Sequence, residues 1–246
     1  QPALFPDAHE AERFRTPSVV HISERGALVG QVVEELAIEQ PDLPVIRFVK
    51  LRMGESGPIF VDHRERAWTA EGVSALILKK LKRDAKAFSG QNLGGVIITI
   101  PASFSDAQRR ATLYAGHLAG LQVVDLIEEP VAAALHYGTT VARDASTVLV
   151  YDLGGGTFDA TVMAVGPQGT RTLATEGGAN LGGKEFDESV MALLAEQFRA
   201  QDGYDPLADP AAVGELRRVA EALKIKLSQP TRAEVTQSLV LGGRAG

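Results

Sequence analysis

The sequence predicts an α/β fold, because runs of residues typical of strands alternate with amphipathic helical stretches. The alternation is clearest in the middle of the chain, where apolar runs at 95–100 and 121–127 flank a helix begun by Ser105 and Gln108. Beyond residue 145 the order changes to successive strands followed by two long helices. This change predicts two lobes with a boundary near residues 143–145.

The length and composition of the chain exclude several kinds of site and partner. With 246 residues, 45% of them hydrophobic, the chain has enough length to bury about 70% of its unfolded surface in one large domain or two lobes. The absence of cysteine excludes disulfides, thiolate metal sites and cysteine nucleophiles, and it fits a reducing compartment such as the cytoplasm. A net charge of −6 argues against nucleic acid and anionic membranes as partners. No apolar run is long enough to span a membrane, and the acidic start is not typical of a signal peptide.

The first part of the chain is expected to hold short strands and two helices. Glu24-Arg25-Gly26 is a hairpin signal between two β-rich runs. Apolar residues recur at helical spacing from Val73 to Ala85, with a basic face expected to point to solvent. The expected elements are a hairpin of 17–22 and 27–29, a helix over 31–39, strands at 45–49, 59–61 and 67–68, and a helix from 69 to about 85.

The rest of the chain is expected to supply the main sheets and the long helices. The run 95–100 is continuously apolar, which is typical of a strand buried on both faces of a sheet. Pro130 suits the first turn of a short helix. The expected elements are strands at 95–100, 121–127, 146–153, 157–165 and 170–175, helices at 105–120, 130–137, 185–200 and 210–229, and a β-like run at 233–241.

The stretch Tyr151-Asp152-Leu153-Gly154-Gly155-Gly156-Thr157 is the best candidate phosphate site. Three successive residues without Cβ let backbone N–H groups converge on an anion. Asp152 could hold Mg²⁺ through water, and Thr157 could orient a water or touch the terminal phosphate. The alternative is a purely structural glycine hairpin, but ordinary hairpins use two-residue turns of another composition. The motif therefore favours a functional turn.

A pair of carboxylates, Glu128 and Glu129, ends an apolar strand just before Pro130. Strand ends of this kind line the ligand crevice of open α/β folds, where Glu129 could act on a metal-bound water. The alternative is that both glutamates simply favour a helix N-terminus electrostatically. The pair alone does not decide between these interpretations.

Glu221, Lys224 and Ser228 recur at spacings of three and four, so they share one face of the predicted helix 210–229. Polar residues on such a face are usually just solvated, and the pattern alone is weak. Residues 178–184 match the first seven positions of a P-loop, but Glu185 stands where the Mg²⁺-binding Ser or Thr belongs. The five histidines show no metal-site spacing, and no nucleophile elbow is present.

Four ordered stretches carry a resemblance to a known family. They are VIITIPASFSDAQRRAT, GLQVVDLIEEPVAAALHYG, VLVYDLGGGTFDATV and LGGKEFD. Together they closely resemble the ATPase domain of the seventy-kilodalton heat-shock chaperones. The resemblance runs from Arg15 to about Ser228 and is weakest at 24–68.

The resemblance implies an actin-like, ribonuclease H-like ATPase fold, in which two lobes close on ATP or ADP and Mg²⁺. Residues 1–144 would form part of lobe I, with a shortened small subdomain at about 16–69, and residues 145–246 would form part of lobe II. The full-length protein would couple ATP hydrolysis to the binding of unfolded peptides and would work with co-chaperones.

The resemblance also implies roles for individual residues. Glu129, Asp152 and Thr157 match positions that act in hydrolysis. Asp152, Glu129 and Asp159 match positions near the metal, mostly through water. The residues matching nucleotide contacts are Gly154, Gly155, Gly156, Thr157, Gly182, Gly183, Glu221, Lys224 and Ser228.

Pro101 and Arg109 match positions that couple the nucleotide state to the peptide-binding domain. On residue spacing alone, Arg109 is expected to point outward from its helix at a lobe surface. A solvated arginine with no further role is the alternative. The residues expected to face the core from this helix are Ala111, Tyr114, Ala115 and Leu118.

The sequence departs from the family pattern in ways that affect the predicted activity. The first phosphate hairpin, Asp-Leu-Gly-Thr-Thr, would precede residues 15–20, and the second adenosine motif would follow Gly246. Lys50 aligns better with the lysine just before the catalytic one of the family. We therefore expect an ATPase domain that lacks both ends and hydrolyses ATP weakly or not at all by itself.

Two other hypotheses remain open at the level of sequence. One is a non-hydrolysing member of the same fold that serves as a nucleotide-sensing or scaffold module. The other is a different actin-like class, such as a sugar kinase or a cytoskeletal filament protein. The spacing of IEEPVAAALHYG and GGKEFD argues against the second hypothesis.

Overall fold

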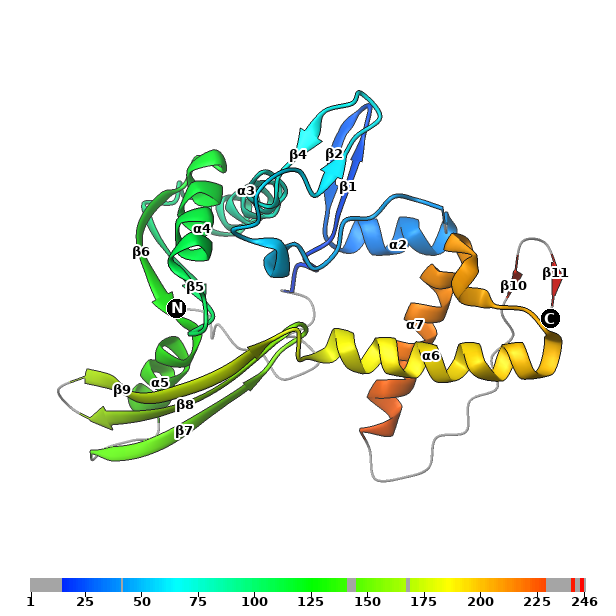
Figure 1. Ribbon diagram of the computed structural model, residues 1–246. Helices are drawn as coiled ribbons and strands as arrows, with labels where there is room; N and C mark the ends of the chain where they lie inside the picture. Colours follow the sequence, from blue (N-terminus) through cyan, green and yellow to red (C-terminus); the bar gives the residue numbers. More distant parts are fainter. Residues whose placement is uncertain are drawn as a thin grey trace.

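The computed structural model describes residues 15–40, 42–140, 145–166, 169–228, 240–241 and 244–245. These parts combine helices with small β-sheets, as expected for an α/β protein (Figure 1). The elements are β1 (Val20–Ser23), β2 (Gly26–Val29), α2 (Gln31–Glu39), the 3₁₀ helix η2 (Val49–Arg52), β3 (Phe60–Val61), β4 (Ala67–Trp68), α3 (Ala70–Ser89), β5 (Gly95–Ile100), α4 (Asp106–Leu118), β6 (Gln122–Glu128), α5 (Glu129–Thr140), β7 (Ser146–Leu153), β8 (Thr157–Gly166), β9 (Gly169–Ala179), α6 (Gly183–Asp202), η3 (Pro206–Ala208), α7 (Pro210–Leu227), β10 (Val240–Leu241) and β11 (Arg244–Ala245).

The front of the chain follows the predicted order with one exception. The hairpin β1–β2 and helix α2 are confirmed. The strand predicted at 45–49 is wrong, because the backbone of this run forms only a single isolated bridge, between Ile46 and Val20. At Phe48 the chain adopts a left-handed conformation, with φ 55°, and turns into η2. This turn carries residues 48–52 away from β1 and toward the second half of the protein.

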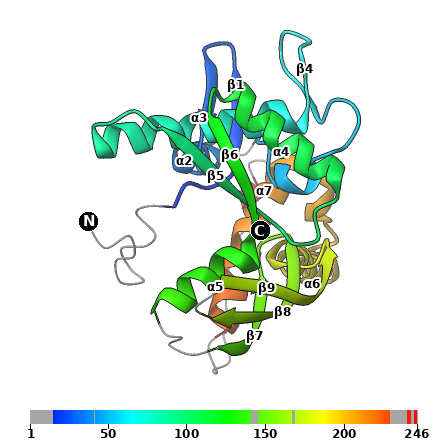
Figure 2. The ribbon, with the colours of Figure 1, turned by 90° about the vertical axis from the view of Figure 1, so that its left-hand side faces the viewer.

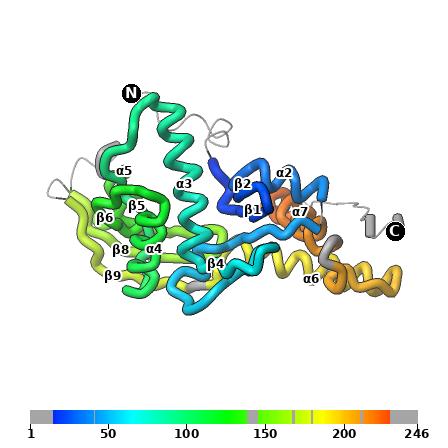
Figure 3. The backbone as a smooth tube through the Cα atoms, turned by 90° about the horizontal axis from the view of Figure 1, so that it is seen from above, coloured from blue at the N-terminus to red at the C-terminus, as the bar shows by residue number. Residues whose placement is uncertain are grey.

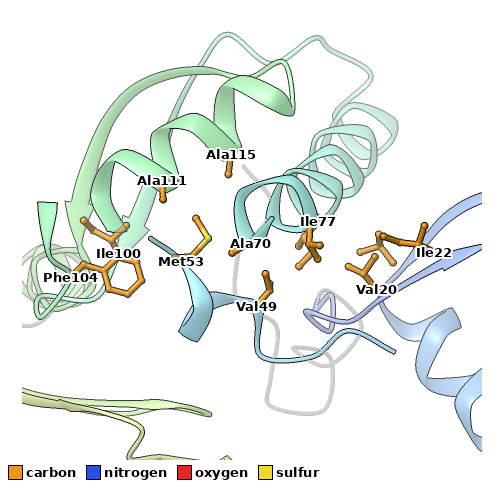
Figure 4. Close-up of a cluster of buried hydrophobic side chains, with 12 residues drawn as sticks. Val20, Ile22, Val49, Met53, Ala70, Ile77, Ile100, Phe104, Ala111 and Ala115 are labelled. Carbon is orange, nitrogen blue, oxygen red and sulfur yellow. The ribbon is translucent and has the colours of Figure 1, made fainter. Parts of the chain in front are cut away.

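The largest core lies where α3 and α4 pack together beside β1, β2 and η2 (Figure 4). The N-cap of α3 is Thr69, whose hydroxyl accepts a hydrogen bond from the Gly72 amide. The predicted capping box of Ser105 and Gln108 is confirmed at the start of α4. The buried residues of this core are Val20, Ile22, Val29, Val49, Met53, Ala70, Val73, Ile77, Ile100, Phe104, Ala111 and Ala115.

Helix α4 buries a narrower stripe than its spacing predicts. Ala111 and Ala115 are buried as expected, whereas Tyr114 and Leu118 are exposed, which corrects the sequence prediction. The cause is the close approach of α4 to β6, since a Cβ at Gly116 would lie only 2.5 Å from Cγ2 of Val123. Small residues form that contact, and the larger ones beside them turn to solvent.

Strands β5 and β6 form a two-stranded parallel sheet, and their register pairs Ile100 with Glu128 (Figure 2). The prediction that β5 is buried on both faces is wrong for the described residues, because the side chain of Ile97 is 57% exposed and that of Val124 on β6 is 59% exposed. Helix α4 packs on this sheet, and the outward-facing side chains lie uncovered in the described part of the chain.

Strands β7, β8 and β9 form an antiparallel meander. Helix α5 packs on one face of it and places Ala134 against Met163 and Val165. The predicted boundary falls largely on residues 141–144, which lie outside the described residues. The division into 1–144 and 145–246 therefore stays a prediction.

Helices α6 and α7 pack against each other around Met191, Ala195 and Leu216. Helix α6 begins directly beyond the end of β9, and α2 from the front of the chain lies against α7 (Figures 1 and 3). The β-like run predicted at 233–241 lies outside the described residues except for β10. In the described parts of the chain, no helix has the length and apolarity needed to cross a membrane.

The β3–β4 hairpin is organised around the buried carboxylate of Asp62. It accepts hydrogen bonds from the amides of Arg64 and Arg66, from Nε of Arg66 at 2.8 Å and from Nε1 of Trp68 at 3.0 Å. Burial alone would raise the pKa of Asp62, but these hydrogen bonds outweigh it and hold the pKa far below its ordinary value.

Because the folded pKa is depressed, ionised Asp62 stabilises the hairpin above the unfolded pKa, and this stability is lost as the pH falls through the folded value. Trp68 is the only tryptophan, so its fluorescence reports directly on this network. We expect Asp62→Asn to change the emission of Trp68 at neutral pH and to remove its acid transition. Asp42→Asn is the control, and an unchanged titration in Asp62→Asn would contradict the assignment.

Candidate functional site

The glycine turn of Gly154, Gly155 and Gly156 joins β7 to β8 and is closed by a hydrogen bond from the Gly154 amide to the Thr157 carbonyl, at 2.9 Å. The turn also receives bonds from the start of α6. The amide of Gly183 donates to the Gly154 carbonyl at 2.9 Å, and the amide of Lys184 donates to the Gly155 carbonyl at 2.8 Å. The turn is therefore fixed from one side by the N-terminus of α6.

This attachment determines where the amides of the turn point. The Gly156 carbonyl accepts a hydrogen bond from Asn180, so three successive carbonyls of the turn face the β9–α6 connection. A trans peptide directs its N–H opposite to its carbonyl, and no described peptide bond is cis. The amides of Gly155, Gly156 and Thr157 therefore point away from α6, an arrangement suited to an anion.

Because Gly182 has no side chain, the β9–α6 connection can approach the glycine turn closely. A Cβ at Gly182 would lie 2.6 Å from the Gly156 nitrogen and 2.7 Å from the Gly154 carbonyl oxygen. The same contact argues against a P-loop at 178–184. A strand and a helix do flank this segment, but the first amides of α6, at Gly183 and Lys184, already donate to the glycine turn.

Asp152 and Asp159 face each other across β7 and β8 as a directly opposed pair. Side chains in such a pair lie on the same face of the sheet, where two like charges destabilise each other. Burial raises the pKa of Asp159, and the charge of Asp152 adds to that increase. The Oδ1 atom of Asp159 is buried without a hydrogen-bond partner and lies against Gly177, where a Cβ would overlap it.

The pair fits a hydrated Mg²⁺ better than a directly chelated ion. Magnesium prefers oxygen ligands and keeps several of its waters, so one or two carboxylates suffice. No group of three or more histidine, aspartate or glutamate side chains in the described part of the chain could hold a metal by itself. The contact through water predicted for Asp152, Glu129 and Asp159 stays a prediction.

Glu129 begins α5 and forms an ion pair with Lys50, whose Nζ lies 2.7 Å from Oε1 of Glu129. The family resemblance leaves the role of Lys50 undefined, because the front of the chain is shortened there. The structure brings this lysine next to the predicted catalytic carboxylate, and its positive charge also acts to lower the pKa of Asp159. Lys50 therefore joins the candidate site.

The segment around η2 contacts several parts of the site. A Cβ at Gly156 would lie 3.0 Å from Cδ1 of Leu51, so Leu51 packs on the glycine turn. The ring of Phe48 lies 5.8 Å from Nζ of Lys184 on α6 and 6.0 Å from Cζ of Arg217 on α7. Both distances fall within the range of cation–π contacts. The left-handed turn at Phe48 thus carries this segment across to the second half of the protein.

Ser103 is a second residue that sequence reasoning missed. It lies between β5 and α4, and its hydroxyl and backbone act to lower the pKa of Asp159 against the effect of burial. A short polar loop residue gives no signal in the sequence, because its partner on β8 is far along the chain.

Lys224 on α7 fastens this helix to the N-terminus of α6. Its Nζ lies 2.7 Å from Oδ1 of the buried Asp187 and donates to the Gly183 carbonyl at 3.3 Å. Ser228 donates to the Lys224 carbonyl at 3.0 Å, and the side chain of Glu221 is exposed. The structure therefore connects Lys224 to Gly183, which bonds the glycine turn, while the roles of Glu221, Lys224 and Ser228 in nucleotide binding stay predictions.

Arg109 does not simply point outward, which corrects the expectation from helical spacing. Its Nη2 lies 2.7 Å from Oε1 of Glu128, and its Nε donates to the Phe104 carbonyl at 3.2 Å. Pro101, at the start of the same loop, is fully buried. The guanidinium bends back over the N-terminus of α4, because two acceptors within reach satisfy it better than solvent does.

Comparison with known proteins supplies the family. The family model described as "Hsp70 protein" matches residues 7–241. The chaperone protein DnaK of Thermotoga neapolitana is 41% identical over 244 residues, which cover 99% of this chain and 40% of that protein. This chain thus spans about two-fifths of the length of that relative. On both findings, the chain belongs to the Hsp70 family.

Proposed function

We propose that this chain forms the nucleotide-binding part of a chaperone and holds ATP or ADP together with Mg²⁺. The carrying observation is the opposed pair of Asp152 and Asp159, whose buried Oδ1 accepts no hydrogen bond, beside the glycine turn with its outward amides. A site that offers amides to an anion and carboxylates to a hydrated cation is complementary to a Mg²⁺-bound phosphate chain.

In this proposal each group has a separate task. The amides of Gly155, Gly156 and Thr157 would bind phosphate oxygens, and the Thr157 hydroxyl would act at the terminal phosphate. Asp152 and Asp159 would hold the hydrated metal, which would supply charge neutralisation. Glu129, oriented by Lys50, accepts a hydrogen bond from the attacking water, and the Lys50 ammonium offsets developing negative charge.

The adenosine would lie along α7 and the start of α6. Gly183 is held by Lys224, so the phosphate turn and the polar face of Glu221, Lys224 and Ser228 are mechanically connected. Gly182 keeps the chain close to the glycine turn without a side chain in the way.

The wider role is proposed by analogy with the family. A protein that carries this domain together with a peptide-binding domain would use ATP hydrolysis to control the binding of unfolded peptides in the cytoplasm, with co-chaperones as partners. Pro101 and Arg109 would transmit the nucleotide state to the peptide-binding domain. A non-hydrolysing scaffold remains the alternative, and a protein of that kind would bind nucleotide without turnover.

Calorimetric titration of ADP into the purified chain, with Mg²⁺ and with a chelator, tests the proposal. We expect binding that Mg²⁺ strengthens about tenfold or more, because the paired aspartates need a cation between them and the phosphates. Single-turnover assays with ATP are expected to show weak hydrolysis or none in this chain. Affinity that is absent, or unchanged by Mg²⁺, would contradict the proposal.

A further inference from the structure

We propose that Glu128 is a positioning residue that acts through Arg109 to hold Glu129 in a fixed place relative to the loop between β5 and α4. The inference rests on the proposed nucleotide site and adds a residue to it. Glu128 and Glu129 are neighbours in sequence, yet each carboxylate binds a different cation. Arg109 on α4 binds Glu128, and Lys50 on η2 binds Glu129, both at 2.7 Å.

The first step concerns the end of β6. Glu128 is the last residue of the strand and Glu129 the first of α5, so the peptide between them carries any shift of one directly to the other. Glu128 is also paired in register with Ile100, the buried last residue of β5. A charge-assisted bond at Glu128 therefore fixes the point from which the Glu129 side chain starts.

The second step concerns the loop between β5 and α4. Arg109 donates from Nε to the Phe104 carbonyl and from Nη2 to Glu128. Ser103, the neighbour of Phe104, acts to lower the pKa of Asp159, so this loop belongs to the site. One guanidinium thus ties the strand end that bears Glu129 to the loop that contains Ser103 and Phe104. Only a rigid fork of donors makes both contacts at once, and a lysine offers no such fork.

The competing explanation is an ordinary ion pair at a partly exposed site. The side chains of Arg109 and Glu128 are 32% and 28% exposed, and ion pairs exposed to solvent contribute little to stability. That explanation predicts that the charge of Arg109 matters and its shape does not. It also predicts that any loss of nucleotide affinity is the same with and without Mg²⁺.

The variants Glu128→Gln and Arg109→Lys test the proposal, with Asp125→Asn on the same strand and Arg110→Lys on the same helix as matched controls. We expect each test variant to reduce the strengthening of ADP binding by Mg²⁺ about tenfold, as loss of an outer partner does at metal sites. Affinity measured in chelator should stay within about twofold of the wild type. The double variant should lose no more of the Mg²⁺-dependent strengthening than either single variant, because both substitutions break the same contact between Arg109 and Glu128.

A second measurement works without nucleotide and so separates this proposal from the proposed function. Hydrogen exchange in the ligand-free chain should become about fivefold faster at the Phe104 amide and in the second turn of α5, whose amides donate to the carbonyls of the first turn, in both variants. If the wild type binds no nucleotide, the proposed function fails, and exchange still tests the link. Unchanged exchange, normal exchange in Arg109→Lys alone, or equal losses of affinity with and without Mg²⁺ would each overturn the proposal.

Discussion

Replacing Gly182 with alanine is expected to lower the free energy of unfolding by about 1–3 kcal/mol and to abolish measurable nucleotide binding. The added Cβ would lie 2.6 Å from the Gly156 nitrogen and 2.7 Å from the Gly154 carbonyl oxygen, and both are backbone atoms that cannot rotate away. To relieve the overlap, the glycine turn must separate from the start of α6. That movement breaks the bonds donated by Gly183 and Lys184 and releases the orientation of the turn amides.

Gly155→Ala is the matched control for stability, because a Cβ at Gly155 meets no atom within 4 Å in the described structure. Its free energy of unfolding should stay within about 0.5 kcal/mol of the wild type, as for most substitutions without a clash. Urea unfolding of both variants checks the difference, and ADP titration checks binding. If Gly182→Ala were as stable as Gly155→Ala, the close approach of the two turns would be contradicted.

The family and the actin-like α/β fold class could be predicted from the sequence, and so could most elements whose signals are local. The hairpin β1–β2 follows from a Glu-Arg-Gly turn, and the start of α4 follows from Ser105 and Gln108. In each case the residues that specify the structure lie within a few positions of one another, so no knowledge of tertiary packing is needed.

The errors come from features that tertiary structure decides. The run 45–49 has the composition of a strand, but Phe48 turns left-handed to reach Lys184 and Arg217. The apolar run of β5 predicts burial on both faces, yet Ile97 is exposed because burial depends on which elements cover each face. The sequence shows the intrinsic preference of a residue for strand or helix, but it does not show which elements pack against that residue in the fold.

The candidate site also combines features that local sequence shows with features that only the tertiary structure shows. Asp152 and the glycine turn are visible in the sequence because they are contiguous. Lys50 is 79 positions from Glu129, and a shortened front region obscures its alignment, so only the fold shows that the two side chains meet. The pairing of Asp152 with Asp159 was also hidden, because it depends on the register between β7 and β8.

Asp159→Asn is expected to have opposite effects on stability and on metal-linked binding. The pKa of Asp159 is raised, first by burial and then by the charge of Asp152, so ionised Asp159 destabilises the metal-free fold. A group with a raised folded pKa contributes stability that is present at low pH and lost as the pH rises through that value. Asparagine has nearly the same size as aspartate and removes the charge. We therefore expect the metal-free variant to be more stable than the wild type at neutral pH, by up to about 1 kcal/mol or a rise in Tm of about 2–4 °C.

The same substitution should reduce the strengthening of ADP binding by Mg²⁺ about tenfold or more, because the cation loses the charge of a buried carboxylate. Glu176→Gln is the control, since it removes one negative charge from an exposed position on the neighbouring strand β9. Thermal unfolding in chelator and ADP titration at two Mg²⁺ concentrations measure both effects on one preparation. A purely structural glycine hairpin predicts that Asp159→Asn changes stability alone. A variant that is less stable without metal and binds Mg²⁺–ADP like the wild type would refute the assignment of the aspartate pair to the cation.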